Sequence, residues 1–139
     1  MVKINFMYVL IGLVIIFMII TGVLGLKVLK GDKRVIVSDL ETKTSEGEVT
    51  VDLTPKEFNG GKFYVDIGVN THSVDLNGFD LKELVKLEVN GEVIKPISAP
   101  ELSGHHNSGT LIFKVEDKPK NFVIKIKGLP DTNERIFEW

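Results

Sequence analysis

Histidine is scarce in this sequence, and its three copies fall in two short segments. His72 lies within Thr71–Leu76, and His105 and His106 are adjacent within Ser103–Gly109. Neutral imidazole is a good ligand for Cu(II) and Zn(II). Two histidines from one loop and a third from the end of a neighbouring strand therefore form a candidate copper or zinc site.

A metal-bound histidine often donates its second ring N–H to a carboxylate, which fixes the orientation of the ring. Asp75 and Asp66 are the candidates for this role. A purely structural role is the alternative. Neighbouring residues of an extended segment point to opposite sides, so His105 and His106 rarely bind one ion together. The chain has no cysteine, which excludes thiolate sites and a blue-copper centre. A metal site and a pair of structural corners both remain open.

Other chemistries find less support in the sequence. A hydrolase triad could be assembled from Ser73 or Ser108 with a histidine and an aspartate, but no G-x-S-x-G motif is present. No D-x-D-x-D-G calcium loop occurs either. We therefore do not expect an enzyme. From Val35 onward the chain has 12 Lys and Arg against 18 Asp and Glu, a net charge of −6, which argues against nucleic-acid binding.

Short runs of alternating apolar and polar residues must position these side chains. In Lys62–Asn70 every second residue is apolar, which is typical of a strand with one buried face. Asn90-Gly91 between two apolar runs predicts a tight hairpin. We expect strands at 35–40, 48–53, 62–70, 85–89, 93–94, 111–115, 122–126 and 135–139, a turn at 41–47, a strand end at Pro55 and one helical turn from Asp80 to Glu83. These seven or eight strands predict an all-β fold, an immunoglobulin-like antiparallel β-sandwich.

The N-terminal run from Phe6 to Leu26 has 21 residues without a charge or a proline. As a helix it would be about 32 Å long, which matches a hydrocarbon core of about 30 Å. The run exceeds the apolar core of an ordinary signal peptide, although Val23–Gly25 resembles a weak cleavage site. We therefore expect one uncleaved transmembrane α-helix rather than a removed signal.

Two arguments about the side of the membrane on which the domain lies point in opposite directions. Lys27, Lys30, Lys33 and Arg34 follow the apolar run, whereas Lys3 alone precedes it, and a simple charge count places the domain inside. A folded domain after the flank weakens that rule, and we expect the domain on the outer face of the cell membrane. We divide the chain into a transmembrane anchor at 1–28, a basic juxtamembrane linker at 29–34 and a soluble β-sandwich domain at 35–139.

Four segments resemble a family of uncharacterised prokaryotic exported or membrane-anchored β-domains. The family has a T-H-S-x-D-L element, a G-H-H-x-x-G-x-L-x-F element and an R-x-F-x-W end. In this chain the three elements correspond to T-H-S-V-D-L at 71–76, G-H-H-N-S-G-T-L-I-F at 104–113 and R-I-F-E-W at 135–139. The fourth similar segment is D-L-K-E-L-V-K-L at 80–87. The resemblance covers about residues 49–139. It implies an intact domain and supplies no activity.

These observations together predict a single-pass, membrane-anchored binding or scaffold module, with a histidine-based transition-metal site at one rim. The lipid bilayer is its first expected partner. An alternative is an accessory subunit of a larger membrane complex, in which the anchor helix is the contact surface. Gly12, Gly22 and Gly25 would permit close helix approach, although no G-x-x-x-G motif occurs.

Overall fold

A computed structural model describes residues 11, 13–16, 18, 35–36 and 40–139 of the chain. The chain divides into two compact units, Met1–Asp32 and Lys33–Trp139. The described residues of the first unit are helical, apolar and about half exposed or more. Most of the expected anchor and the whole linker at 29–34 lie outside the described residues. Within the described part of the chain, no helix has both the length and the apolar character to span a membrane.

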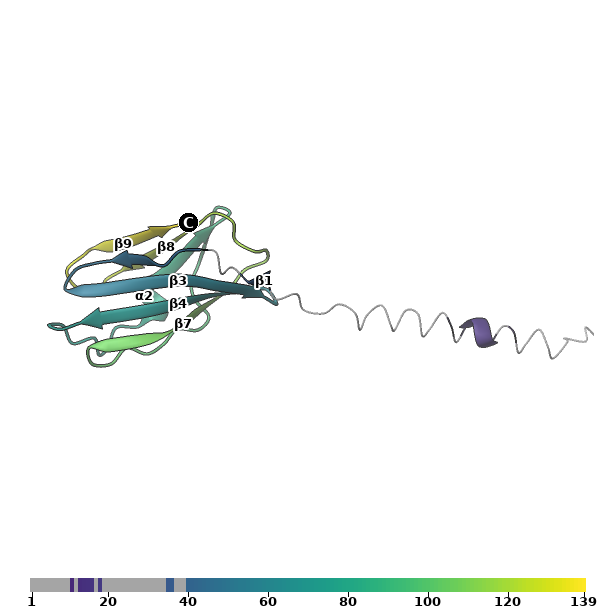
Figure 1. The fold of residues 1–139 in the computed structure, drawn as a ribbon, viewed down its shortest axis with the longest axis horizontal. Helices are drawn as coiled ribbons and strands as arrows, with labels where there is room; N and C mark the ends of the chain where they lie inside the picture. Colours follow the sequence, from purple (N-terminus) through teal and green to yellow (C-terminus); the bar gives the residue numbers. More distant parts are fainter. Residues whose placement is uncertain (1–10, 12, 17, 19–34, 37–39) are drawn as a thin grey trace, which may run out of the picture. The chain divides into compact units, whose positions relative to one another are not determined.

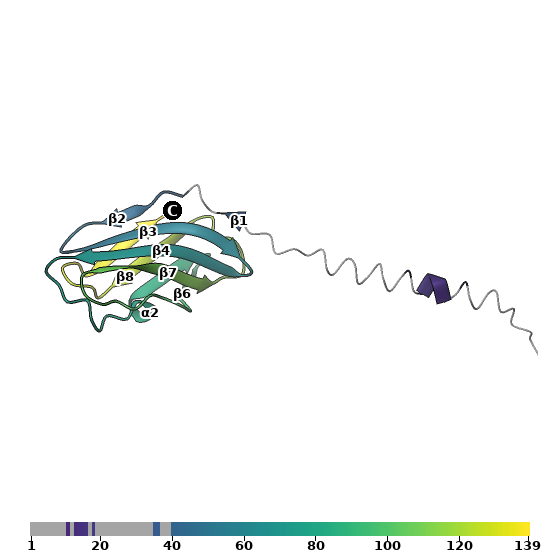
Figure 2. The ribbon, with the colours of Figure 1, turned by 60° about the horizontal axis from the view of Figure 1, so that its bottom comes forward.

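The second unit consists of two antiparallel β-sheets packed face to face (Figures 1 and 2). The first sheet contains β1 (Val35–Ile36), β2 (Lys43–Ser45), β3 (Val49–Asn59), β4 (Lys62–Thr71) and β7 (His106–Lys114). The second sheet has the order β6 (Glu92–Ile94), β5 (Val85–Val89), β8 (Phe122–Lys127) and β9 (Glu134–Glu138). The predicted all-β sandwich is confirmed.

The chain crosses between the sheets in a Greek-key pattern. β3 and β4 form a hairpin, the chain crosses to the β5–β6 hairpin, and it returns so that β7 pairs with β4. It then crosses again, β8 pairs with β5, and β9 completes a last hairpin. This connectivity places segments from distant parts of the sequence side by side, including the two that carry the histidines.

The core lies between the sheets and is built from the residues that alternate in the sequence. On β4, Phe63, Val65, Ile67 and Val69 are buried while the residues between them are partly exposed. The ring of Phe63 meets that of Phe122 on β8 edge to face, with 5.0 Å between centroids. This contact joins the two sheets, and the period-2 interpretation of β4 is correct.

Several local predictions are wrong. β7 begins at His106 and not at Leu111, so residues 106–110 belong to a strand and not to the expected loop. β3 does not end at Pro55, because this proline pairs with Val65 and the strand continues to Asn59 after a register shift between Pro55 and Glu57. Proline cannot donate to the ladder, and such a shift accommodates it. The polar stretch at 41–47 is not only a turn, since β2 within it pairs with β3. Of the first predicted strand, Val35–Ile36 is a strand, residues 37–39 lie outside the described residues, and Leu40 is not a strand residue.

The predicted Asn90-Gly91 turn and the predicted helical turn after Asp80 are confirmed. Asn90 and Gly91 have φ of 52° and 82° in the β5–β6 hairpin, the backbone that favours Asn-Gly there. The single helix of the described part of this unit, α2 (Leu81–Leu84), begins after Asp80, whose side chain accepts a hydrogen bond from the Lys82 N–H.

The two ends of β4 lie about 30 Å apart at about 3.3 Å per residue. At one end, Val35 of β1 pairs with Phe58, next to the β3–β4 turn. At the other end, Asn70 pairs with His106, the first residue of β7. The histidines therefore lie at the end of the sandwich opposite to the end at which β1 pairs with β3.

Candidate functional site

Two of the three histidines meet at this end of the sandwich. His72 directly follows the last residue of β4, and His106 begins β7. Their ring centroids lie 5.5 Å apart with the planes at 76°. Both residues are exposed to solvent. The predicted proximity of the two segments is thus correct for one histidine from each.

Asn70 holds the ring of His106. The Nδ1 atom of His106 lies 3.1 Å from the Asn70 side-chain oxygen. A carboxamide oxygen only accepts, so this hydrogen bond requires the proton on Nδ1, which leaves Nε2 unprotonated in a neutral ring. A hydrogen bond of this kind orients metal-binding histidines. Sequence reasoning missed Asn70, because only the β4–β7 register places it opposite His106.

Thr71 fixes the backbone on both sides of the histidine pair. Its buried hydroxyl accepts hydrogen bonds from the N–H groups of Ser73 and Val74, at 3.3 and 3.2 Å. Its own N–H donates to the carbonyl oxygen of His105, at 2.9 Å. The segment that carries His72 and the loop that carries His105 are therefore joined through one buried residue.

His105 has a different role from its two companions. It is exposed, and its backbone carbonyl rather than its ring makes the contact to Thr71. Among residues 40–139 and the few described before them, no group of three or more His, Cys, Asp or Glu side chains could hold a metal ion. The arrangement seen here is a pair, His72 and His106, and not the three-histidine cluster that the sequence suggested.

The two carboxylates expected behind the rings are engaged elsewhere. Asp75 accepts a hydrogen bond from the Asn77 N–H at 2.9 Å, which shapes its own turn. Asp66 accepts from the Thr110 hydroxyl at 2.9 Å and lies 3.4 Å from the Lys56 ammonium. It is four residues from Asn70 along β4, a distance of about 13 Å. Asn70 occupies the position that we expected a carboxylate to fill.

The serines do not form a catalytic arrangement in the described part of the chain. Ser73 contributes its backbone N–H to Thr71, and neither Ser73 nor Ser108 has a hydrogen bond to a histidine there. A nucleophile needs a base within hydrogen-bond reach. These residues therefore give the hydrolase alternative no geometric support.

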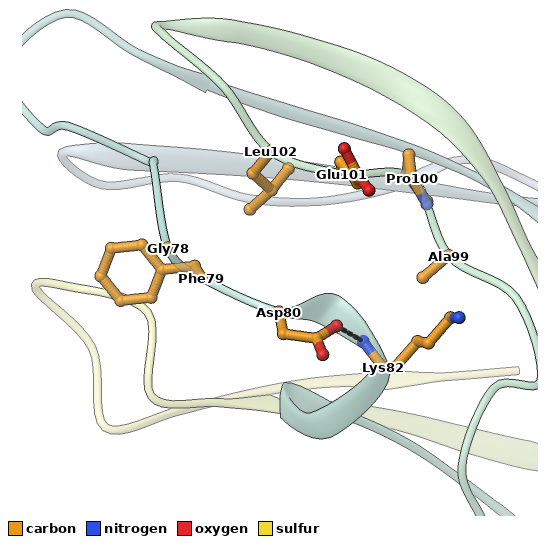
Figure 3. A pocket seen from close by; sticks show the side chains of 8 residues that line it. All are labelled: Gly78, Phe79, Asp80, Lys82, Ala99, Pro100, Glu101 and Leu102. Atoms are coloured by element: carbon orange, nitrogen blue, oxygen red, sulfur yellow. Dashed lines mark hydrogen bonds between the residues drawn. The ribbon is translucent and has the colours of Figure 1, made fainter.

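A pocket that the sequence did not predict opens between the loop before α2 and the loop after β6 (Figure 3). Its volume is about 390 Å³, and Phe79 and Leu102 form part of its apolar wall. Asp80 also lines the pocket, and its carboxylate accepts a hydrogen bond from the Lys82 N–H. The sequence contains only two weak signals for this pocket, the turn at Gly78 and the prolines Pro96 and Pro100.

A buried arginine forms a second polar cluster that sequence reasoning missed. The Arg135 side chain is fully buried, and its Nη2 donates to the Val49 carbonyl at 3.0 Å and to Asp131 at 2.5 Å. Asp131 also accepts from the Val49 N–H at 3.2 Å. Gly47 packs on this carboxylate so closely that a Cβ there would lie 2.2 Å from its oxygen.

The surroundings of Asp131 shift its pKa. Burial favours the neutral acid, but hydrogen bonds from Thr132 and from the Val49 N–H, together with the charge of Arg135, outweigh it and lower the pKa below the ordinary 3.8. The carboxylate is therefore ionised at neutral pH and pairs with Arg135. This cluster joins the start of β3 to the loop before β9.

No protein-family model, curated protein or solved structure matches the chain.

Proposed function

We propose that this protein is a membrane-anchored binding module of the outer cell surface, with a two-histidine site for Cu(II) or Zn(II) at one rim. The observation that supports the site is the His72–His106 ring pair with Asn70 behind it. Membership in the family of prokaryotic exported or membrane-anchored β-domains is part of the same proposal.

An immunoglobulin-like sandwich is the finer description that we propose for the domain. In support, β7 pairs with β4 and β8 pairs with β5 across the two sheet crossings. This pattern of pairing is common among immunoglobulin-like and fibronectin-like domains. Such domains present their binding residues at the ends of the sandwich, where the loops gather.

The anchor is supported by the sequence of the first unit. Its 21-residue apolar run has the length of a membrane span. Its described residues are helical, and the apolar side chains of Leu13 and Ile16 are 61% and 55% exposed. A helix that exposes apolar side chains needs lipid or another helix around it. A partner helix is the route by which the chain would instead serve as an accessory subunit.

The chemistry of the rim suits a labile metal ion. His106 Nε2 and one ring nitrogen of His72 would supply two ligands, and water or a ligand from solution would complete the shell. Exposure leaves these positions open to exchange. Asn70 would keep His106 in the tautomer that binds through Nε2.

The test is metal binding by the full chain in detergent, with Zn(II) followed by isothermal titration calorimetry and Cu(II) by electron paramagnetic resonance. We expect one site per chain, lost in His72→Ala and in His106→Ala. His105→Ala is the matched control, because this exposed histidine lies one residue from the pair and its ring is outside it. Equal loss in all three variants, or no binding by the native chain, would overturn the two-histidine site.

A further inference from the structure

The outer face of the first sheet carries short polar side chains in register across β3, β4 and β7. We call this surface the hydroxyl face. Its three rows are Thr54–Asp66–Thr110, Asp52–Gly68–Ser108 and Thr50–Asn70–His106. The row that contains Asn70 also borders the histidine pair.

Gly68 is one of the residues that line a shallow hollow of about 380 Å³ in this face. Its φ is not positive, so the backbone does not require a glycine there. A Cβ would lie 3.6 Å from Asp52 Oδ2 and 3.7 Å from Asn70 Nδ2, which are ordinary contacts. Glycine within a strand often marks the close approach of a ligand. Its absent side chain leaves an open floor between a hydrogen-bond acceptor and a donor.

The polar groups around this floor divide into committed and available ones. Asp66 accepts from Thr110 and pairs with Lys56, and Asp52 Oδ1 accepts from Thr44 at 2.5 Å. Within residues 40–139, Asp52 Oδ2 and the Ser108 hydroxyl make no hydrogen bond.

Asn70 contributes the donor. Its side-chain oxygen is held by His106, which leaves the Nδ2 protons directed away from that bond. An acceptor, a donor and a hydroxyl of either sense therefore surround Gly68.

We infer that this hollow binds a neutral saccharide unit. A sugar hydroxyl donates one hydrogen bond and accepts others, so a carboxylate oxygen beside an amide N–H satisfies it in both senses. The carboxylate of Asp52 has no cation within the described contacts, which disfavours phosphate groups and other anions.

The composition of the floor also disfavours a protein partner. The residues that line the hollow are polar or glycine, except Ile67, whose side chain is buried in the core. Protein interfaces usually place large apolar or aromatic side chains at their centre. A small hydroxyl-rich molecule fits this floor better.

The test uses saturation-transfer NMR on the full chain, in a zwitterionic detergent without a sugar headgroup, because a glycoside detergent would compete. The probes are maltohexaose, cellohexaose and chitohexaose at millimolar concentration. We expect at least one to receive saturation. Two variants should weaken it about tenfold or more: Gly68→Val, which fills the floor with a residue that strands accept, and Asp52→Asn, which removes the charged acceptor.

Glu88→Gln is the matched control, because it neutralises a partly exposed strand carboxylate on the outer face of the other sheet. It should leave the signal unchanged. No signal from any probe, or a signal that Gly68→Val and Asp52→Asn leave intact, overturns the saccharide site. Binding only to phosphatidylglycerol vesicles overturns it also. Zn(II) binding by His72 and His106 should survive in Gly68→Val, so failure of one proposal is distinguishable from failure of the other.

Discussion

Two polar clusters flank the pair that Val49 forms with Thr71, and they differ in their exposure to water. On one side, Arg135 and Asp131 hold both backbone groups of Val49. On the other side, the histidine that follows Thr71 meets His106 in solvent. The polar groups of the first cluster form hydrogen bonds within the protein that connect β3 to the loop before β9. The second leaves ring nitrogens available.

The difference follows from the cost of burying charge. A buried guanidinium without partners would destabilise the fold, so Nη2 of Arg135 is held by a carboxylate and two carbonyl groups. Its Nε and Nη1 are buried and have no hydrogen-bond partner among the described residues. Exposed imidazoles have no such requirement, because water satisfies them. One hydrogen bond from Asn70 is enough to orient His106 and does not occupy its second nitrogen. Burial therefore indicates a stability role for the Arg135 cluster, and the binding role that we propose for the histidine pair needs its exposure; variants can test both.

The largest expected effect is on the buried side. Arg135→Ala should lower the free energy of unfolding by about 3–5 kcal/mol, because it empties a large buried volume and leaves the Asp131 carboxylate without its cation. Urea unfolding followed by the fluorescence of Trp139, the single tryptophan of the chain, measures this. Trp139 stacks on Phe122 with 5.1 Å between centroids and so reports on the core.

Lys127→Ala is the control for this variant, since Lys127 is exposed on β8 and pairs with Glu134 beside Arg135. It should change stability by no more than about 0.5 kcal/mol. The double variant Arg135→Met with Asp131→Asn should recover part of the loss, because it removes both charges and keeps the volume. Equal stability of Arg135→Ala and Lys127→Ala would show that the buried cluster does not support the fold.

Sequence reasoning predicted the strands well because alternation is local. Phe63, Val65 and Ile67 show their buried face within five residues, and the Asn90-Gly91 turn carries its own conformational preference. Pro55 misled the prediction for a similar reason. A missing N–H was read as a strand end, whereas the pairing of β3 with β4 on both sides of the proline preserves the strand.

The two polar clusters were only half visible in the sequence, because they depend on long-range register. Histidine is rare enough to attract attention without a structure. Asn70 attracts none until β7 pairs with β4 and places it opposite His106. Arg135 contacts Val49, 86 positions earlier in the chain, and a lone arginine near the terminus gives no sign of burial. Composition shows which groups exist, and topology decides which of them meet.

The next largest expected effect concerns Zn(II) binding by the exposed histidine pair. Zn(II) at 100 times its dissociation constant should raise the free energy of unfolding by about 2.7 kcal/mol if the unfolded chain does not bind it. The same titration on His106→Ala should give no increase, and His105→Ala should behave like the native chain. Stabilisation that persists in His106→Ala would locate the metal elsewhere.

A smaller effect tests the orientation of His106. Asn70→Ala should weaken Zn(II) binding about tenfold, equivalent to about 1.4 kcal/mol, because the ring loses the bond that fixes its tautomer. Asn70→Asp keeps an acceptor for the Nδ1 proton and should retain the affinity. Calorimetry on the two variants distinguishes them. If both variants bind Zn(II) as the native chain does, Asn70 is a neighbour of the site and does not position it.

The smallest effect concerns the pH dependence of the buried cluster. The pKa of Asp131 is lowered in the folded protein, so its ionised form contributes stability that is complete above the unfolded pKa near 3.8. This contribution is lost as the pH falls through the lower folded pKa, when the carboxylate takes up a proton. The native chain should therefore lose stability more steeply below about pH 4 than Asp131→Asn, which has no proton to bind there. Urea midpoints between pH 2.5 and 7, recorded for both chains, measure the two slopes.

The difference between the two slopes should be modest because solvent reaches Asp131 and screens its charge. Parallel curves would mean that the Arg135 cluster stabilises the fold through packing and hydrogen bonds to backbone carbonyls, and not through the charge of its carboxylate.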